Sequence, residues 1–331
     1  MSRTIPHMKS ARFLFLAVLL WGSTGALASP YEWALAFPKT NFTRAVIDLS
    51  EIRATGAARD SIPAILAPKF QAAESITGMG ELEPVLRIEI GGEVRGYPLR
   101  ILLWHELVND TIQGVPVLIS YSPLSSSAVV FERRVDGRPL VFANTGLLRH
   151  YNTVIYDQAT ESWWQQYSGD GVVGQWAGKR LQPIASRIQS FAQFKRSHAK
   201  AGVLVPSDPK ASDYGQTPFV RMDSRNDTAA QFPYAIPDGI GPLDRVVVIG
   251  DQAWSLARLR ERTRIETDAV VLMWTPGMNS VHDTRWIPFG RDIGNVQAWM
   301  KTPSGTSDAV YDTTFAFAFA AFHPKGSWHL Q

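Results

Sequence analysis

The stretch Val85-Leu86-Arg87-Ile88-Glu89-Ile90-Gly91-Gly92-Glu93-Val94 decides the fold class of this chain. Its first six residues alternate between apolar and polar side chains, which is typical of a strand with one buried face. Gly91-Gly92 is a natural hairpin turn, and residues 94–97 predict the partner strand. Because Pro98 is tolerated in the first turn of a helix, we expect a helix from Pro98 to about Val108.

More strands and one more helix are expected on the C-terminal side of this hairpin. The apolar runs at 115–121 and 127–133 predict two buried strands, and Asp136-Gly137 predicts a tight turn after the second. Residues 188–198 predict an amphipathic helix with Phe191 and Phe194 on one side.

The second half of the chain resembles the first in miniature. Residues 246–251 repeat the strand and turn that begin at Val85, and residues 269–281 align without a gap on residues 116–128. Four matching blocks in the same order favour an internal duplication over chance similarity. We therefore predict an α+β fold, mainly β, with two related β-rich lobes and a few short helices.

The expected divisions of the chain follow from this pattern. They are a signal peptide at 1–28, an N-terminal lead-in at 29–80, a first repeat at 81–205, a connector at 206–243 and a shorter second repeat at 244–331.

Residues 1–28 have the three parts of a secretory signal peptide. Basic residues open the segment, Phe13–Trp21 is an apolar run too short to span a bilayer, and Ala26-Leu27-Ala28 is a small-residue cleavage site. We expect cleavage after Ala28 and a periplasmic or secreted product without a stable membrane anchor. The alternative is an uncleaved anchor.

Charge and cysteine content narrow the function classes. The chain has 331 residues, with 33 Lys and Arg, 30 Asp and Glu and no Cys. Three of the basic residues and none of the acidic ones lie in residues 1–28, so the expected mature chain holds 30 of each. This balance gives no support for nucleic-acid binding. The lack of cysteine excludes disulfides, thiolate metal sites and a cysteine nucleophile.

The first candidate site is the segment Trp104–Asp110. On the expected helix, His105 lies on an apolar stripe, while Glu106 and Asp110 are one turn apart on another face. A buried histidine or glutamate must be hydrogen-bonded or paired. We favour a structural polar network, and the alternative is a general acid/base or metal site.

The second candidate site is the loop at residues 121–127, where the sequence resembles a known family. The matching motifs are Tyr97-Pro98-Leu99, Trp104-His105-Glu106, Val108-Asn109-Asp110, Gly114-Val115-Pro116-Val117 and Tyr121-x-Pro123-Leu124. Together they resemble the bacterial and archaeal domain-of-unknown-function family 3179. The resemblance covers roughly residues 60–205 well and the remaining chain more weakly, and it implies no established activity.

This chain departs from that family at one place. The resemblance implies Cys-Pro-Leu-Cys where the chain has Ser122-Pro123-Leu124-Ser125. Serines supply neither a thiolate nor a disulfide, so a thiol-based role is in doubt here. A serine nucleophile is an alternative, although adjacent serines are more often turn residues. In the second half, Met278 and His282 could bind a soft metal, but we expect a core Met and a surface His.

We therefore predict an exported binding or accessory protein with a pocket between the His105–Asp110 helix end and the Ser122–Ser127 loop. The expected ligand is an unidentified small molecule or protein partner, without nucleic acid, cofactor or metal. The alternative is a hydrolase-like or metal-dependent enzyme that uses His105 and Glu106. The candidate residues are His105, Glu106, Ser122 and Ser125 for catalysis, and Asn109, Asp110, Tyr121, His150 and Asn152 for binding.

Overall fold

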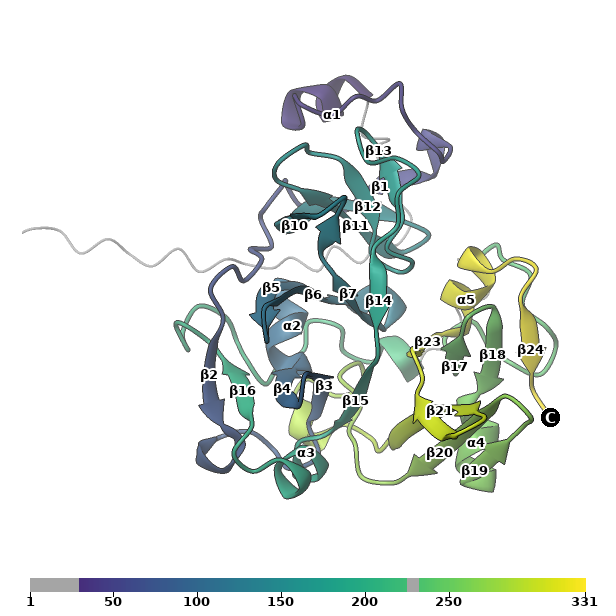
Figure 1. Cartoon of the computed structure of the whole chain (residues 1–331). Coiled ribbons are helices and arrows are strands. Elements are labelled where there is room, and N and C mark those ends of the chain that lie inside the picture. The colour runs from purple at the N-terminus through teal and green to yellow at the C-terminus, as the bar shows by residue number, and fades with distance from the viewer. Residues whose placement is uncertain (1–29, 225–231) are drawn as a thin grey trace, which may run out of the picture.

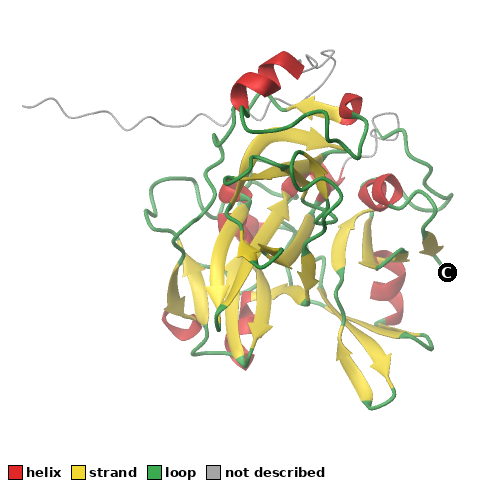
Figure 2. Cartoon of the chain, turned by 45° about the horizontal axis from the view of Figure 1, so that its top comes forward, coloured by secondary structure: helices red, strands yellow, loops and turns green. Residues whose placement is uncertain are grey.

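The computed structural model describes residues 30–224 and 232–331 (Figure 1). Strands dominate this part of the chain and the helices are short, as Figure 2 shows. Its five larger sheets form a propeller-like arrangement. The predicted mainly β fold with a few short helices is confirmed, whereas the predicted signal peptide lies outside the described residues.

The helices in the described ranges are each two turns long. The α-helices are α1 (Pro30–Ala36), α2 (Leu99–His105), α3 (Phe191–Ser197), α4 (Leu256–Arg262) and α5 (Ala316–Phe322). Short 3₁₀ turns are η1 (Leu49–Glu51), η2 (Ala73–Ser75), η3 (Pro123–Ser125), η4 (Met222–Ser224) and η6 (Ile287–Phe289). None of these helices has both the length and the apolar character needed to cross a membrane.

The predicted hairpin at residues 85–97 is present at the centre of a five-stranded sheet. In spatial order its strands are β15 (Ser186–Ser190), β3 (Pro84–Ile90), β4 (Glu93–Pro98), β16 (Gly202–Val205) and β2 (Lys69–Ala72). Gly91 and Gly92 form the turn with φ of +57° and +80°, a conformation that glycine adopts without a steric penalty. β16 runs parallel to β4, and the other pairs are antiparallel.

Two further sheets complete the N-terminal half. One is β14 (Gln182–Ile184), β7 (Ser127–Glu132), β6 (Val115–Ser122) and β5 (Leu107–Ile112). The other is β1 (Ile52–Ala54), β10 (Phe142–Arg149), β11 (Asn152–Asp157), β12 (Trp163–Gln165) and β13 (Gly171–Val173). The predicted turn at Asp136-Gly137 joins the short strands β8 (Arg134–Val135) and β9 (Arg138–Pro139).

Two sheets form the C-terminal half. The first is β23 (Asp312–Phe315), β17 (Arg245–Ile249), β18 (Gln252–Ser255) and β24 (Ser327–His329), with β24 parallel to β18. The second is β19 (Arg264–Glu266), β20 (Val270–Thr275), β21 (Asn295–Thr302) and β22 (Gly305–Asp308).

The helix expected from Pro98 to about Val108 is shorter than predicted. α2 ends at His105, because Glu106 has a φ of +58° and its N–H donates to the Leu102 carbonyl. The chain then enters β5, so the expected helical stripe from His105 to Val108 and the helical pairing of Glu106 with Asp110 are wrong. The β-branched residues of β5 favour this strand over a continued helix.

The helix expected at 188–198 begins three residues later. Residues up to Ser190 belong to β15 and pair with β3, with Ile188 opposite Leu86. Ser190 caps α3, because its side chain accepts a hydrogen bond from the backbone N–H of Gln193.

Two edge strands, β23 and β15, each contact a strand of the other half of the molecule (Figure 1). β23 lies against β7, where Asp312 Oδ1 accepts a hydrogen bond from the Ala128 N–H at 3.0 Å. β15 lies against β21, where Asn295 Oδ1 accepts one from the Ser190 N–H at 2.7 Å. These contacts place the 122–127 loop at the junction between the halves.

Candidate functional site

The loop at residues 122–127 turns tightly between two antiparallel strands. β6 ends at Ser122, η3 follows, and Ser126 adopts a left-handed conformation with φ of +55° before β7 begins at Ser127. Ser122, Ser125 and Ser127 have no exposed surface, and Ser126 is buried as well. The hydroxyl groups of the loop therefore face the protein interior.

Glu106 approaches this loop through Thr153 on β11. The Thr153 hydroxyl lies 3.1 Å from Glu106 Oε2 and 3.1 Å from Ser122 Oγ, and Ser122 Oγ also accepts the Thr153 N–H at 3.1 Å. Burial raises the pKa of Glu106 to about 7, and the hydrogen bond from Thr153 opposes this change. The carboxyl group is thus poised to exchange a proton near neutral pH.

Ser125 belongs to a second set of buried hydrogen bonds, centred on Asn152. Asn152 Nδ2 donates to Ser125 Oγ at 2.9 Å and to Gln166 Oε1 at 2.6 Å. Asn152 Oδ1 accepts from Gln165 Nε2 at 2.6 Å and from the Tyr167 N–H at 3.1 Å. Its amide group is therefore saturated by protein partners, and it holds the loop against the sheet that contains β11 and β12.

A charged cluster from the C-terminal half lies against the other side of the loop. Arg245 Nη1 donates to Ser126 Oγ at 2.6 Å, and its Nη2 lies 3.1 Å from Asp223 Oδ2. Asp223 also accepts from Ser280 Oγ at 2.6 Å and from Arg291 Nη1 at 2.9 Å. Its carboxylate is fully buried, and although burial alone would raise its pKa, these cationic partners hold the pKa below its ordinary value.

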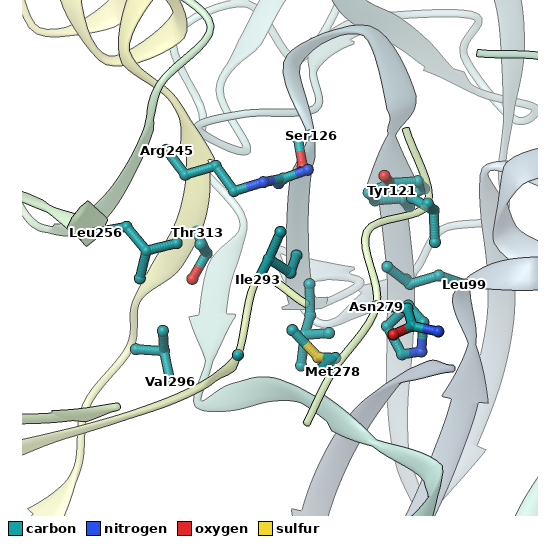
Figure 3. Close-up of a pocket in the computed structure, with 14 residues that line it drawn as sticks. Leu99, Tyr121, Ser126, Arg245, Leu256, Met278, Asn279, Ile293, Val296 and Thr313 are labelled. Carbon is teal, nitrogen blue, oxygen red and sulfur yellow. The ribbon is translucent and has the colours of Figure 1, made fainter. Parts of the chain in front are cut away.

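A small cavity lies beside the contact between the loop and this cluster. Figure 3 shows the guanidinium group of Arg245 reaching toward Ser126, with Tyr121, Asn279 and Met278 around the cavity. Its volume is about 20 Å³, which is enough for a single ordered water molecule. A cavity of this size is too small for a metabolite.

His282 is fully buried, so the expectation of a surface histidine is wrong. Its Nδ1 lies 3.2 Å from Arg245 Nη2, a donor, so Nδ1 accepts and Nε2–H donates to the Pro123 carbonyl at 2.8 Å. Burial lowers its pKa to about 3, and the charge of Arg245 acts in the same direction. A neutral His282 therefore fixes the 122–127 loop, and Tyr121 Oη lies 3.5 Å from the same Nε2.

His105 makes contacts that are separate from those of Glu106. Its Nδ1 lies 2.7 Å from the Pro63 carbonyl, and its Nε2 lies 2.7 Å from the hydroxyl of Tyr214, whose ring stacks on the imidazole. Burial lowers the pKa of His105, while the hydrogen bond to Pro63 opposes this change. Both nitrogens are thus engaged by protein groups.

The remaining predicted residues lie away from the loop. Asn109 on β5 exchanges two hydrogen bonds with the backbone of Phe142, at 2.8 and 2.9 Å. Asp110 Oδ2 accepts from Arg95 at 2.6 Å and from Tyr97 Oη at 2.5 Å. His150 lies beside the Tyr234 hydroxyl, 3.2 Å away. The structure therefore gathers Glu106, Tyr121, Ser122, Ser125 and Asn152 around the loop, but not His105, Asn109, Asp110 or His150.

The charged residues of the junction, Asp223 and Arg245, are not among the residues predicted from the sequence. Asp223 lies in the predicted connector, and Arg245 is the first residue of β17, directly before an apolar run. A charge at the start of a buried strand was the available signal, since a buried charge needs a partner. Within residues 30–224 and 232–331, no group of three or more His, Asp or Glu side chains is arranged to hold a metal ion.

Comparison with known proteins places this geometry in a family. A family model described as a protein of unknown function (DUF3179) matches residues 59–326. The chain belongs to this family. The match includes the 122–127 loop, Glu106 and the charged cluster, so the predicted family is confirmed over most of the chain. No curated protein and no solved structure matches the chain.

Proposed function

We propose that this member of the family is an exported binding or accessory protein and not an enzyme. The observation that carries the proposal is the burial of Ser122 and Ser125, whose hydroxyls are hydrogen-bonded to protein groups. A nucleophile must reach its substrate, and a base must have a free nitrogen or oxygen within hydrogen-bond distance of it. The engaged nitrogens of His105 support the same conclusion.

The binding region that we propose is an open groove beside the β3–β4 hairpin. Phe70, Glu93, Arg95, His198 and Lys200 line it, and its volume is about 670 Å³. Small-molecule sites commonly measure about 300–1,000 Å³, so the groove has room for a metabolite. Of the predicted binding residues, Asp110 reaches this region through its ion pair with Arg95.

One observation favours the enzymatic alternative. The carboxyl group of Glu106 has a pKa near 7, and the Thr153 hydroxyl lies 3.1 Å from both Glu106 Oε2 and Ser122 Oγ. To act as a general base, Glu106 would need Ser122 to donate its proton to Thr153 and Thr153 to donate to the carboxylate. For catalysis, the loop would have to open to solvent.

Hydrolysis assays with p-nitrophenyl acetate and p-nitrophenyl phosphate separate the two functions. We expect the purified protein, Ser122→Ala and Glu106→Gln all to give the rate of buffer alone. A rate above that of buffer, lost in both variants, would establish the enzyme. In parallel, native mass spectrometry of the exported protein should show a co-purified small molecule that is lost in Lys200→Trp, which crowds the groove.

Export is tested by the mass of the protein recovered from the periplasm or medium. We expect a chain that begins at Ser29, because small residues at 26 and 28 suit signal peptidase. Ala28→Leu should leave the leader attached, and Leu27→Ala is the matched control that should still be processed. A full-length wild-type protein in the cytosol would contradict the proposal.

We also propose that the two β-rich parts arose by internal duplication. The order β15-β3-β4-β16 and the order β23-β17-β18-β24 both end in a parallel pair, and both hairpins lead into a seven-residue helix. The order β14-β7-β6-β5 likewise corresponds to β22-β21-β20-β19. A crystal structure in which β17, β18 and α4 superpose on β3, β4 and α2 would support a common origin.

A further inference from the structure

Two arginines lie directly opposite each other on neighbouring strands, and one of them, Arg87, contacts His198, which lines the groove. Arg187 on β15 is the register partner of Arg87 on β3, so their side chains leave the same face of the sheet. Like charges in directly opposed positions destabilise a sheet. A nearby anionic group would offset the repulsion between the two arginines.

Protein groups neutralise only one of the two arginines. Arg87, which is 6% exposed, pairs with Glu89, and its Nε donates to His198 Nε2 at 3.3 Å. Within the described residues, Arg187 forms no hydrogen bond or ion pair, and its Nε is buried without a partner. A buried guanidinium nitrogen without an acceptor destabilises the folded protein, because it has lost its hydrogen bonds to water and forms none with the protein.

Burial and the neighbouring Arg87 both lower the pKa of Arg187 and so disfavour its charged form, while Tyr311 acts in the opposite direction. Asp308 and Glu89 attract Arg187 but neither forms an ion pair with it. Burial and Arg87 also lower the pKa of His198, which keeps that ring neutral beside the arginines.

We propose that Arg87, Arg187 and His198 bind the oxyanion group, phosphate or carboxylate, of a small molecule. Guanidinium groups bind such groups through paired N–H donors, which would satisfy Arg187 and relieve the repulsion between the arginines. His198 also lines the groove, which leaves room for the rest of the ligand. This inference rests on the proposed binding function and names its ligand class.

The test measures how anions change the stability of the full-length protein. Phosphate, sulfate and succinate are compared with potassium chloride at equal ionic strength, because salt alone screens the repulsion between the arginines. We expect phosphate or succinate to raise Tm by about 3 °C at ten times its Kd, with chloride ineffective. The more effective anion identifies the phosphate or the carboxylate as the group that is bound.

Arginine variants locate the effect. Arg187→Met should weaken anion binding about tenfold or more and, without anion, should raise Tm because the like-charge pair is gone. Arg187→Lys keeps the charge but loses the fork of donors, so its binding should be intermediate. Arg264→Met, at an arginine already paired with Glu266, is the matched control and should keep the wild-type response.

The failures of this inference and of the proposed function give different results. An exported, catalytically inactive protein whose Tm no oxyanion raises above the chloride value would overturn the inference alone. Equal responses in wild type and Arg187→Met would do the same. Ester hydrolysis that depends on Ser122 would overturn the proposed function without changing the anion measurement.

Discussion

The protonation of the Glu106 carboxyl group changes the free energy of unfolding. Its folded-state pKa of about 7 lies above the ordinary value of 4.5, because the carboxyl group is buried. Between these two pH values the native state therefore holds more protons than the unfolded chain. Stability contributed by the protonated carboxyl is present below pH 4.5 and is lost as the pH rises toward 7.

Glu106→Gln should remove this loss, because the amide keeps an acceptor for Thr153 and carries no charge. We expect the variant to exceed wild type in unfolding free energy by up to about 3 kcal/mol near pH 8, and to match it near pH 4. Urea unfolding at both pH values measures the difference. Glu74→Gln, at an exposed position, should show no such pH dependence, and the same result for Glu106→Gln would contradict the assignment.

At the scale of the element, β4 carries a close approach that only glycine permits. A Cβ atom on Gly96 would lie 2.8 Å from Val85 Cγ1 and 2.9 Å from Phe194 Cζ, a ring on α3. Because α3 has only two turns, its buried rings hold it against the sheet. The contact thus couples the hairpin to the helix that ends directly before His198.

Gly96→Ala should destabilise the protein by about 1–3 kcal/mol, since the added methyl group displaces packed side chains. The midpoint of urea unfolding measures the loss. Gly241→Ala is the matched control, because a Cβ atom there meets only the Asp244 carboxyl at 3.5 Å. Equal midpoints for the two variants would show that α3 is not fixed by this contact.

For the whole molecule, Asp223 holds in place the arginine that contacts the N-terminal half. Its carboxylate forms ion pairs with Arg245 and Arg291. Arg245 in turn donates a hydrogen bond to Ser126 in the N-terminal half. Removing one member of a buried ion pair leaves the other charge without compensation.

Asp223→Asn should therefore cost about 3 kcal/mol of unfolding free energy. Calorimetry should also show whether the transition broadens as the halves separate. Glu266→Gln, which breaks an exposed pair with Arg264, should have little effect because water screens that pair. A loss for Asp223→Asn no larger than for this control would mean that other contacts dominate the junction.

Local patterns determined the parts of this fold that depend on neighbours in sequence. The hairpin at Gly91-Gly92, the turn at Asp136-Gly137, the mainly β class and the family all followed from short motifs, because backbone preference and alternation act over a few residues. The short motifs did not predict where the helices begin and end. For example, α2 ends where Glu106 turns toward Thr153, which lies on a different sheet.

Only the tertiary structure decided which polar residues meet. Ser126 and Arg245 are 119 residues apart, and Tyr121 and His282 are 161 apart, yet both pairs meet at one loop. His105 and Glu106 are adjacent in sequence and serve different contacts. Hydrogen bonds and ion pairs act over a few ångströms in space, so the packing of the sheets, and not the order of the residues, selects the partners of a buried polar group.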